Sequence, residues 1–311
     1  MRLIDGKGIA KEIRSELRQW IAEHKKERPP GLLFILVGED PSSRLYVEMK
    51  GRGCREVGIF SKVVALPEEV SQQGLIDQIQ HANQDPHIDG LIVQQPLPPN
   101  LSLFQVMESV DPQKDVDGFH PINMGRLLIG DVSGLLPCTP LGILTLLKRS
   151  HIQVEGREVV VVGRSHIVGK PMAALLMQKG EGRNATVTVA HRASRDLASI
   201  CYRADILIAA VGSPQLIKKE MVKEGAVVID VGMNRLSDHR LVGDVDFSEV
   251  SEKCSAITPV PGGVGPMTIA TLLANTFLSY CRREGIEVEG VKCGLMAGDY
   301  SQWDPHYLTN R

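Results

Sequence analysis

Residues 159–171 read VVVVGRSHIVGKP, and this stretch decides the fold of the chain. Four consecutive valines before Gly163 predict a strand that is buried on both faces, which is typical of parallel α/β sheets. We expect Gly163 to allow a sharp turn, Ser165 to offer a hydroxyl and an amide, and Gly169 to let the next helix lie close to the sheet. A helix N-terminus after such a strand binds pyrophosphate, so the segment predicts a dinucleotide site.

The spacing of this turn leaves a simpler interpretation open. The usual fingerprint is GxGxxG, whereas residues 163–169 follow GxSxxxG, so a tight turn without a ligand is the alternative. A P-loop is excluded, because five residues separate Gly163 from Gly169 and Pro171 stands where Ser or Thr would hold magnesium. We therefore expect no nucleoside triphosphate hydrolysis.

The composition is that of a globular chain of about two domains. It has 311 residues, of which 43% are hydrophobic, and a formal net charge of −2. This charge argues against a nucleic-acid partner. The six cysteines form no CxxC pair, which predicts a reduced, cytoplasmic protein. We see neither a leader sequence nor an apolar run of the ~20 residues that a membrane helix needs, so no membrane contact is expected.

Helix and strand patterns alternate along the first 140 residues. The expected elements are an amphipathic helix spanning Ile9 to Ile21, a strand at 32–37, a helix at about 41–57, a strand at 62–66, a helix at 74–83 and a strand at 89–94. Such alternation predicts a parallel, right-handed α/β sheet.

A second set of elements begins after Pro140. It comprises a helix at 141–150, the valine strand, a helix from Pro171, strands at 185–191, 204–212 and 226–232, and a helix through 218–223. Glycine and proline then gather at PVPGGVGP, before a long apolar helix that starts at Met267.

These patterns divide the chain into two domains and a tail. Residues 1–140 form the first domain and residues 141–266 the nucleotide-binding domain. The helix at about 267–285 is expected to pack back on the first domain. Residues 286–311 form a C-terminal extension to which the sequence assigns no role.

Four polar side chains are candidates for chemistry at one edge of the first sheet. Tyr46 and Lys50 lie four residues apart, so on a helix they share one face. A tyrosine that packs over a surface lysine is the alternative interpretation. Their helix follows the strand at 32–37, at whose carboxyl end ligands of open α/β sheets bind. Gln94 ends another strand and Asp117 lies in the loop DVDGFHP, so both approach the same edge.

The chain resembles the bifunctional methylenetetrahydrofolate dehydrogenase/cyclohydrolase family, also called FolD. The resemblance rests on YVEMK (46–50), VQQPLP (93–98), KDVDGFHPIN (114–123), PCTP (137–140), GRSHIVGKP (163–171), GDVDF (243–247) and PVPGGVGPMT (259–268). It covers about residues 1–285. It implies a homodimer in which a folate lies in a cleft between two α/β domains, the second being a Rossmann-type NADP-binding domain.

The resemblance also implies an activity and roles for the four polar residues. The family oxidises 5,10-methylenetetrahydrofolate with NADP and then hydrolyses the methenyl product to 10-formyltetrahydrofolate. Lys50 would be the catalytic lysine, Tyr46 its neighbour over the folate ring, Gln94 its hydrogen-bond partner and Asp117 the anchor for the pterin. A carboxylate can accept adjacent pterin N–H groups together. The methenyl cation disfavours a protonated Lys50 beside it, so the amine can assist water.

The implied NADP site gathers residues from several loops. Its members are Gly163, Arg164, Ser165, His191, Arg192, Met233 (on the nicotinamide side) and Thr268. A guanidinium such as that of Arg164 can bind a 2′-phosphate in bidentate fashion. Arg192 stands where NAD-selective sites usually carry an acid, so the two arginines favour NADP. A solvated loop arginine is the alternative for Arg192.

The glycine-rich loop would complete the substrate site. Pro261, Gly262 and Gly265 would form a wall beside folate and nicotinamide, because small residues permit close backbone approach. The histidines are scattered, so no catalytic metal is expected. Gln95 stands where the family commonly has an apolar residue, and the chain continues past the family's usual end. Neither departure touches the predicted chemistry.

Three hypotheses compete for the function. The chain is the bifunctional enzyme, a dehydrogenase without the hydrolase step, or a folate-binding or scaffolding protein without catalysis. Lys50, Tyr46 and Gln94 together favour the first. A shikimate-dehydrogenase-like enzyme would share the two-domain plan but should have a different substrate lysine and acid.

Overall fold

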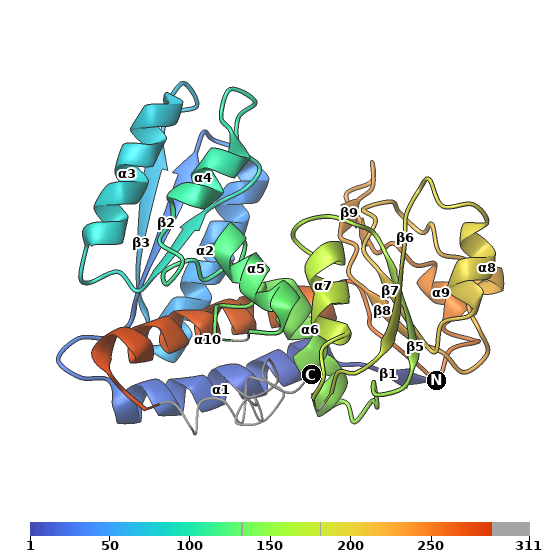
Figure 1. Ribbon diagram of the computed structural model, residues 1–311. Helices are drawn as coiled ribbons and strands as arrows, with labels where there is room; N and C mark the ends of the chain where they lie inside the picture. The colour runs from blue at the N-terminus through green and yellow to red at the C-terminus, as the bar shows by residue number, and fades with distance from the viewer. Residues whose placement is uncertain (132, 181, 288–311) are drawn as a thin grey trace, which may run out of the picture.

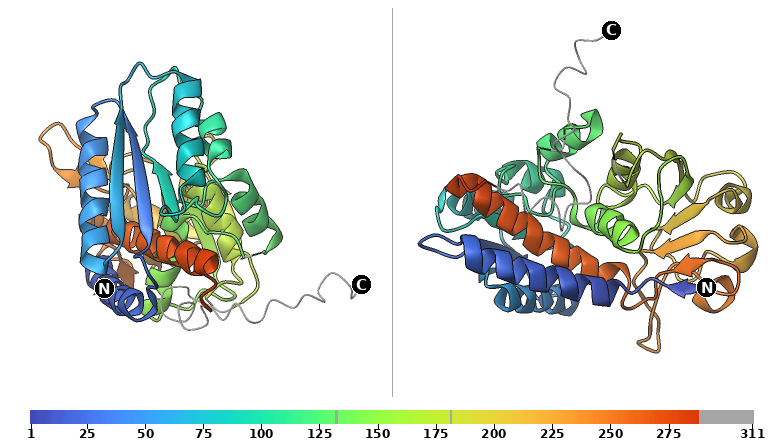
Figure 2. Two further views of the ribbon diagram at one scale, coloured as in Figure 1. Left: turned by 90° about the vertical axis from the view of Figure 1, so that its left-hand side faces the viewer. Right: turned by 90° about the horizontal axis from the view of Figure 1, so that it is seen from below.

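Two α/β lobes make up the part of the chain that the computed structural model describes, residues 1–131, 133–180 and 182–287 (Figure 1). Two long helices, α1 (Gly6–His24) and α10 (Val264–Glu284), run side by side beneath the first lobe (Figure 2). The predicted extension at 286–311 lies outside the described residues apart from 286 and 287.

The first lobe is built on a three-stranded parallel sheet with the order β3-β2-β4. Its elements are β2 (Gly31–Val37), α2 (Pro41–Val57), β3 (Phe60–Leu66), α3 (Gln72–Gln84), β4 (Gly90–Val93), α4 (Leu103–Ser109) and α5 (Pro121–Ile129). Every residue of β2 is buried, because helices cover both faces of this central strand. The strands and helices predicted up to residue 94 are confirmed.

Helix α2 begins and ends at recognisable sequence signals. The side chain of Asp40 accepts a hydrogen bond from the Ser43 N–H at 2.7 Å, and Pro41 occupies the first helical turn. Gly58 ends the helix in the left-handed conformation, with φ at 86°. Because α2 follows β2 directly, it starts at the carboxyl edge of the sheet.

The second lobe contains a six-stranded parallel sheet with the order β1-β11-β8-β7-β5-β6. Its strands are β1 (Arg2–Leu3), β5 (Glu158–Val162), β6 (Thr186–Ala190), β7 (Ile206–Ala209), β8 (Val227–Asp230) and β11 (Ala256–Ile257). Around it lie α6 (Cys138–Arg149), α7 (Gly169–Leu176), α8 (Leu197–Tyr202), α9 (Phe247–Val250), one 3-10 turn (Lys219–Met221) and a small hairpin of β9 (Asn234–Arg235) and β10 (Leu241–Val242).

The valine run of β5 joins two hydrophobic cores. Val159 and Val161 belong to the core that includes α6, α7 and α10, whereas Val160 and Val162 belong to the core on the opposite face of the sheet. All four valines are fully buried, as predicted for a strand covered on both sides.

The order of the strands places a switch point at the carboxyl end of β5. The chain passes from β5 to β6 on one side and then returns to β7 on the other side. In open α/β sheets, ligands bind where the strand order reverses in this way. The turn at 163–169 lies there.

The structure contains elements that were not predicted, namely α4, α5, α8, α9, β9, β10 and β11, and two further segments differ from the predictions. The helix predicted through 218–223 is wrong, because the backbone is extended at Lys218 and at Val222, and only a single 3-10 turn lies between them. The strand β1 was not predicted, and it adds the start of the chain to the edge of the second sheet beside β11.

Helix α10 connects the two halves of the molecule. It follows the second lobe in the sequence, yet it packs against α1 and α2 of the first lobe and against α6. The described helices include none with the length and apolar character that crossing a membrane requires.

Candidate active site

The amine of Lys50 is held by Gln94 at the edge of the first sheet. Nζ of Lys50 donates to Oε1 of Gln94 at 3.0 Å, and Nε2 of Gln94 donates to the backbone carbonyl of Gln95 at 2.7 Å. Both ends of the Gln94 amide are therefore used, so its carbonyl oxygen is aimed at the lysine. Lys50 itself is half-buried.

The charged residues of KDVDGFHP have separate tasks. Lys114 is buried and donates to the carbonyls of Ala82, Asn83 and Asp85 at the end of α3, and burial lowers its pKa to about 8. Asp115 accepts hydrogen bonds from the His120 N–H and the Asn123 amide, and burial raises its pKa. These contacts anchor the loop to α3 before Val116 and to His120 and Asn123 after Asp117. The side chain of Asp117 itself is half-buried.

The buried thiol of Cys138 belongs to a residue whose backbone N–H donates to the carbonyl of Asp117 at 3.3 Å. Burial raises its pKa, the charge of Asp117 adds to the rise, and the charge of Lys50 opposes it. The charges of Asp117 and Lys50 therefore both act on the pKa of this buried thiol.

Asn275 of α10 holds the chain on the N-terminal side of Asp117, a role that was not predicted from the sequence. Its fully buried amide donates to the carbonyls of Val116 at 2.8 Å and Leu136 at 2.9 Å. The first of these carbonyls precedes Asp117 in the chain. An amide side chain inside the apolar run of residues 267–280 is the only sequence signal for this role.

Two glycines shape the turn after β5. Gly163 has φ at 129°, and a Cβ there would lie 2.1 Å from the carbonyl oxygen of Ala210. A Cβ on Gly169 would lie 2.2 Å from the carbonyl oxygen of Gly163. The hydroxyl of Ser165 accepts hydrogen bonds from the Val168 and Gly169 amides, so it caps the start of α7.

The loops after β5 and β6 bring the predicted cofactor residues together in part. Nη1 of Arg164 lies 3.3 Å from Nε2 of His191. The backbone N–H of His191 donates to the hydroxyl of Ser194 at 3.0 Å, which fixes the start of the second loop. Arg164 and Arg192 are both exposed, as a site for a phosphate requires.

The two lobes contact each other through residues that we call the interlobe surface: Tyr46, Phe119, His166, Met233 and Gly265. The hydroxyl of Tyr46 donates to Sδ of Met233 at 2.8 Å. The rings of Phe119 and His166 meet edge to face, with centroids 6.2 Å apart. A Cβ on Gly265 would lie 3.1 Å from Cε of Met233, so the glycine-rich loop borders the same surface.

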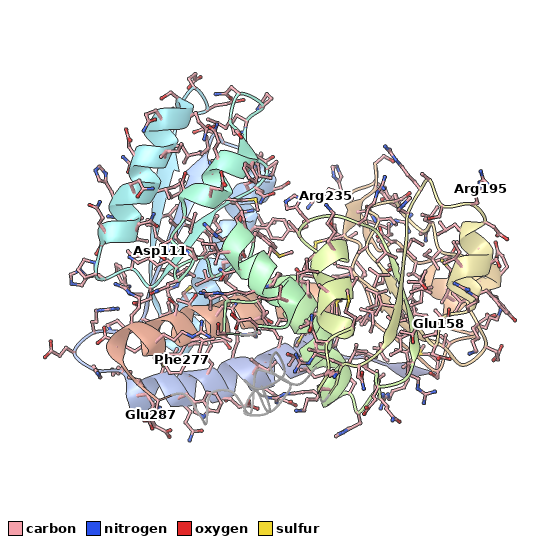
Figure 3. The ribbon with its side chains drawn as sticks, in the orientation of Figure 1. Asp111, Glu158, Arg195, Arg235, Phe277 and Glu287 are labelled. Carbon is pink, nitrogen blue, oxygen red and sulfur yellow. The ribbon has the colours of Figure 1, made fainter. Side chains whose placement is uncertain are left out.

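Other predicted residues lie around this surface. The hydroxyls of Thr268 and Thr139 are 3.1 Å apart, which joins α10 to α6. The carbonyl of Gly262 accepts a hydrogen bond from the Lys7 N–H at 2.8 Å, and Pro261 is exposed. Figure 3 shows Arg235, two residues after Met233, on the side of the second lobe that faces the first.

A cavity of about 350 Å³ lies elsewhere, between segments that include Arg2, His151 and Lys223. It contains none of the predicted site residues. In residues 1–131, 133–180 and 182–287, no group of three or more His, Cys, Asp or Glu side chains could hold a metal ion.

Two family models together match most of the chain. The catalytic domain of tetrahydrofolate dehydrogenase/cyclohydrolase matches residues 4–117, and the NAD(P)-binding domain of the same enzymes matches residues 137–284. The chain belongs to the tetrahydrofolate dehydrogenase/cyclohydrolase family. Its fold class, two α/β domains with the second of Rossmann type, is confirmed.

Individual members of the family are similar along nearly their whole length. The bifunctional protein FolD of Protochlamydia amoebophila is 51% identical over 292 residues, which cover 92% of this chain and 100% of that protein. The crystal structure of the bifunctional FolD enzyme from Campylobacter jejuni is 47% identical, with a TM-score of 0.87, covering 91% of this chain and 99% of the other.

A third family member was solved with ligands. The Trypanosoma brucei dehydrogenase-cyclohydrolase, complexed with NADP and an inhibitor, is 38% identical, with a TM-score of 0.85. The match covers 90% of this chain and 97% of that one. In this family's terms, Tyr46, Lys50, Gln94 and Asp117 lie in the catalytic domain, and the predicted cofactor residues lie in the NAD(P)-binding domain.

Proposed function

We propose that the protein oxidises 5,10-methylenetetrahydrofolate to 5,10-methenyltetrahydrofolate with NADP and hydrolyses that product to 10-formyltetrahydrofolate. One observation carries this proposal. The Lys50–Gln94 pair of the first lobe shares α2 with Tyr46, whose hydroxyl reaches Met233 of the nucleotide-binding lobe. A single ligand on the interlobe surface would therefore meet both sets of groups.

The folate is proposed to lie against the first lobe. Asp117 would accept two adjacent N–H donors of the pterin, which is a charge-assisted pairing. Its half-buried position, and the anchoring of its loop by Lys114 and Asp115, support this role. The exposed ring of Tyr46 offers an aromatic face for the folate ring.

The residues after β5 and β6 fit a bound NADP. The close glycine turn at Gly163 leaves room for a pyrophosphate at the start of α7, and Arg164 with Arg192 offers two exposed guanidinium groups for a 2′-phosphate. NADP bound there would supply the hydride acceptor for the methylene carbon, and the lone pair of a neighbouring folate nitrogen would form the methenyl C=N bond. The chain's own contribution to this step is to orient the two ligands.

Hydrolysis is proposed to depend on Lys50. The positive methenyl group favours the neutral amine, which takes a proton from the attacking water as the new C–O bond forms. Gln94 holds that amine in place through its carbonyl oxygen. One C–N bond of the resulting C–OH adduct then breaks: the amine returns its proton to the leaving nitrogen, and the hydroxyl loses its proton to solvent as the formyl C=O forms, which gives the 10-formyl product.

We propose that the protein is a homodimer joined at the edge of the first sheet. Strand β3 is the edge strand of that sheet, and Phe60 and Val63 on it are 53% and 51% exposed. Figure 2 shows this edge uncovered. A second copy would cover the apolar side chains and pair the open strand.

The free, buried cysteines of the described residues support a reducing, cytoplasmic location.

A spectrophotometric assay tests the proposed function. Purified protein is mixed with 5,10-methylenetetrahydrofolate and NADP, and the methenyl absorbance is followed as it rises and then decays. A rise followed by decay is expected. A rise without enzyme-dependent decay would indicate a dehydrogenase alone, and the absence of both a methenyl rise and NADPH formation would refute the oxidation step.

A further inference from the structure

Two buried carboxylates lie behind Met233 and take no part in the chemistry proposed above. The first is Asp244, which is 0% exposed. It accepts four hydrogen bonds, from the backbone N–H groups of Val211 (2.6 Å), Gly212 (2.9 Å) and Ser213 (2.9 Å) and from Nδ2 of Asn234 (2.9 Å). All four donors are neutral amides. A buried carboxylate needs such donors, so these segments are held firmly around it.

The second carboxylate, Asp230, holds the segment that carries the first. It is the last residue of β8 and accepts hydrogen bonds from the backbone N–H groups of Gly232 (3.0 Å), Asp244 (2.9 Å) and Val245 (3.0 Å). A Cβ at Gly243 would lie 1.7 Å from Oδ2 of Asp230, so this approach requires glycine. The GDVDF motif is thus the packing partner of the end of β8.

The segments tied together in this way border the proposed NADP site. Residues 211–213 follow β7, and the carbonyl of Ala210 just before them contacts the Gly163 turn. Met233 is held on both sides, because the N–H of Gly232 donates to Asp230 and the side chain of Asn234 donates to Asp244. Asp244 therefore connects residues 211–213, which lie beside the Gly163 turn, to the segment of Met233, whose sulfur contacts Tyr46.

We propose that Asp244 is a positioning residue for hydride transfer. Its carboxylate fixes residues 211–213 relative to the Met233–Asn234 segment and so sets the surface on which the nicotinamide ring lies. This inference rests on the proposed function. Asp244 touches no reacting atom, and its hydrogen bonds within the described residues stay inside the second lobe, whereas Lys50, Gln94 and Asp117 belong to the first. Replacing Asp244 should therefore slow oxidation much more than hydrolysis.

Asp244→Asn tests the inference, because it keeps the size of the side chain and turns one acceptor oxygen into a donor that faces N–H groups. We expect kcat/KM for NADP-dependent oxidation to fall by about 10- to 100-fold, as misplaced reactants do. Hydrolysis of methenyltetrahydrofolate supplied directly, without NADP, should stay within about twofold. The matched control is Asp205→Asn at the opposite end of β7, where the carboxylate accepts from the Glu158 N–H and from Lys223. It should change neither rate.

Measuring both activities distinguishes a failure of this inference from a failure of the proposed function. Equal loss of both in Asp244→Asn, or unchanged oxidation, overturns the inference, whereas a wild-type protein without oxidation refutes the proposed function instead. If Asp244→Asn does not fold, Asn234→Ala decides. It removes one donor of four, and we expect oxidation to fall by about 2- to 10-fold with hydrolysis unchanged. Unchanged oxidation in that variant also overturns the inference.

Discussion

The hydroxyl of Tyr46 lies 2.8 Å from the sulfur of Met233, so α2 of the first lobe touches the loop that follows β8 of the second. The same turns of α2 carry Lys50, whose amine is bound to Gln94. This contact places the amine and the nucleotide-binding lobe on one shared surface.

The ring of Tyr46 should contribute more to folate binding than its hydroxyl contributes to stability. A thioether is a weak acceptor and both side chains are partly exposed, so Tyr46→Phe should change the free energy of unfolding by less than about 1 kcal/mol. Tyr46→Ala should raise KM for methylenetetrahydrofolate by about tenfold, because the stacking face is lost. Steady-state kinetics of both variants, with Tyr202→Phe as a control, check this. Equal KM values for Tyr46→Ala and wild type would contradict it.

Lys50→Met should remove cyclohydrolase activity and leave the Kd for NADP within about twofold, because the amine lies on the first lobe and the cofactor turn on the second. Methenyl decay and NADP titration measure the two effects. Lys11→Met, at an exposed position of α1, is the control and should behave as wild type. Undiminished hydrolysis in Lys50→Met would refute the role of this amine.

Arg164→Ala should weaken NADP binding more than NAD binding, by about 1 to 3 kcal/mol, since only NADP carries the 2′-phosphate. Calorimetric titration with both nucleotides gives the difference. The exposed Arg18 of α1, changed to alanine, controls for the general loss of positive charge. An equal loss for the two nucleotides would show that Arg164 does not bind the 2′-phosphate.

Val63→Lys should convert the proposed dimer to a monomer, because it places a charge on the exposed edge strand β3. Light scattering coupled to size-exclusion chromatography measures the mass. Leu128→Lys, on exposed α5, is the matched control and should keep the wild-type mass. A monomeric wild type, or a Val63→Lys variant of unchanged dimer mass, contradicts the proposed interface.

Asp230 should make folding pH-dependent. Burial raises its pKa from 3.8 to about 6, and the charge of Asp244 adds to this rise. The folded protein therefore binds this proton more tightly than the unfolded chain does. The resulting stabilisation is fully present below 3.8 and is lost as the pH rises through about 6.

Urea unfolding from about pH 4 to about pH 7 checks this dependence. The free energy of unfolding should fall less steeply with pH in Asp230→Asn than in wild type, although the variant is less stable overall. Asp205→Asn is the control, because the hydrogen bond from Lys223 lowers the pKa of Asp205 and moves its titration below this range. Parallel curves for Asp230→Asn and wild type would show that Asp230 does not titrate here.

Features encoded within one short segment could be predicted from the sequence. The valine run at 159–162 has the pattern of a strand covered on both sides, and α2 has its capping aspartate, proline and final glycine in place. The four-residue spacing of Tyr46 and Lys50 likewise needs only a helix. These local predictions hold in the folded protein because tertiary contacts favour the same local structure.

Features that depend on distant pairings could not be predicted. Asn275 meets carbonyl groups 159 and 139 residues away, and the sequence shows only an amide in an apolar helix. The acids of GDVDF resemble surface charges until the loops after β7 and β8 fold around them. The segment at 218–223 has helical composition, but its backbone is extended at Lys218 and Val222, which leaves one 3-10 turn.

The pairing of β1 with β11 also determines how the molecule can be divided. A fragment that starts at residue 141 would lack this edge strand, and one that ends at residue 140 would lack α10, against which α1 and α2 pack. We therefore expect that neither half folds on its own and that separately expressed halves must complement one another to become native. By the same argument, we expect the intact chain to unfold in one cooperative transition.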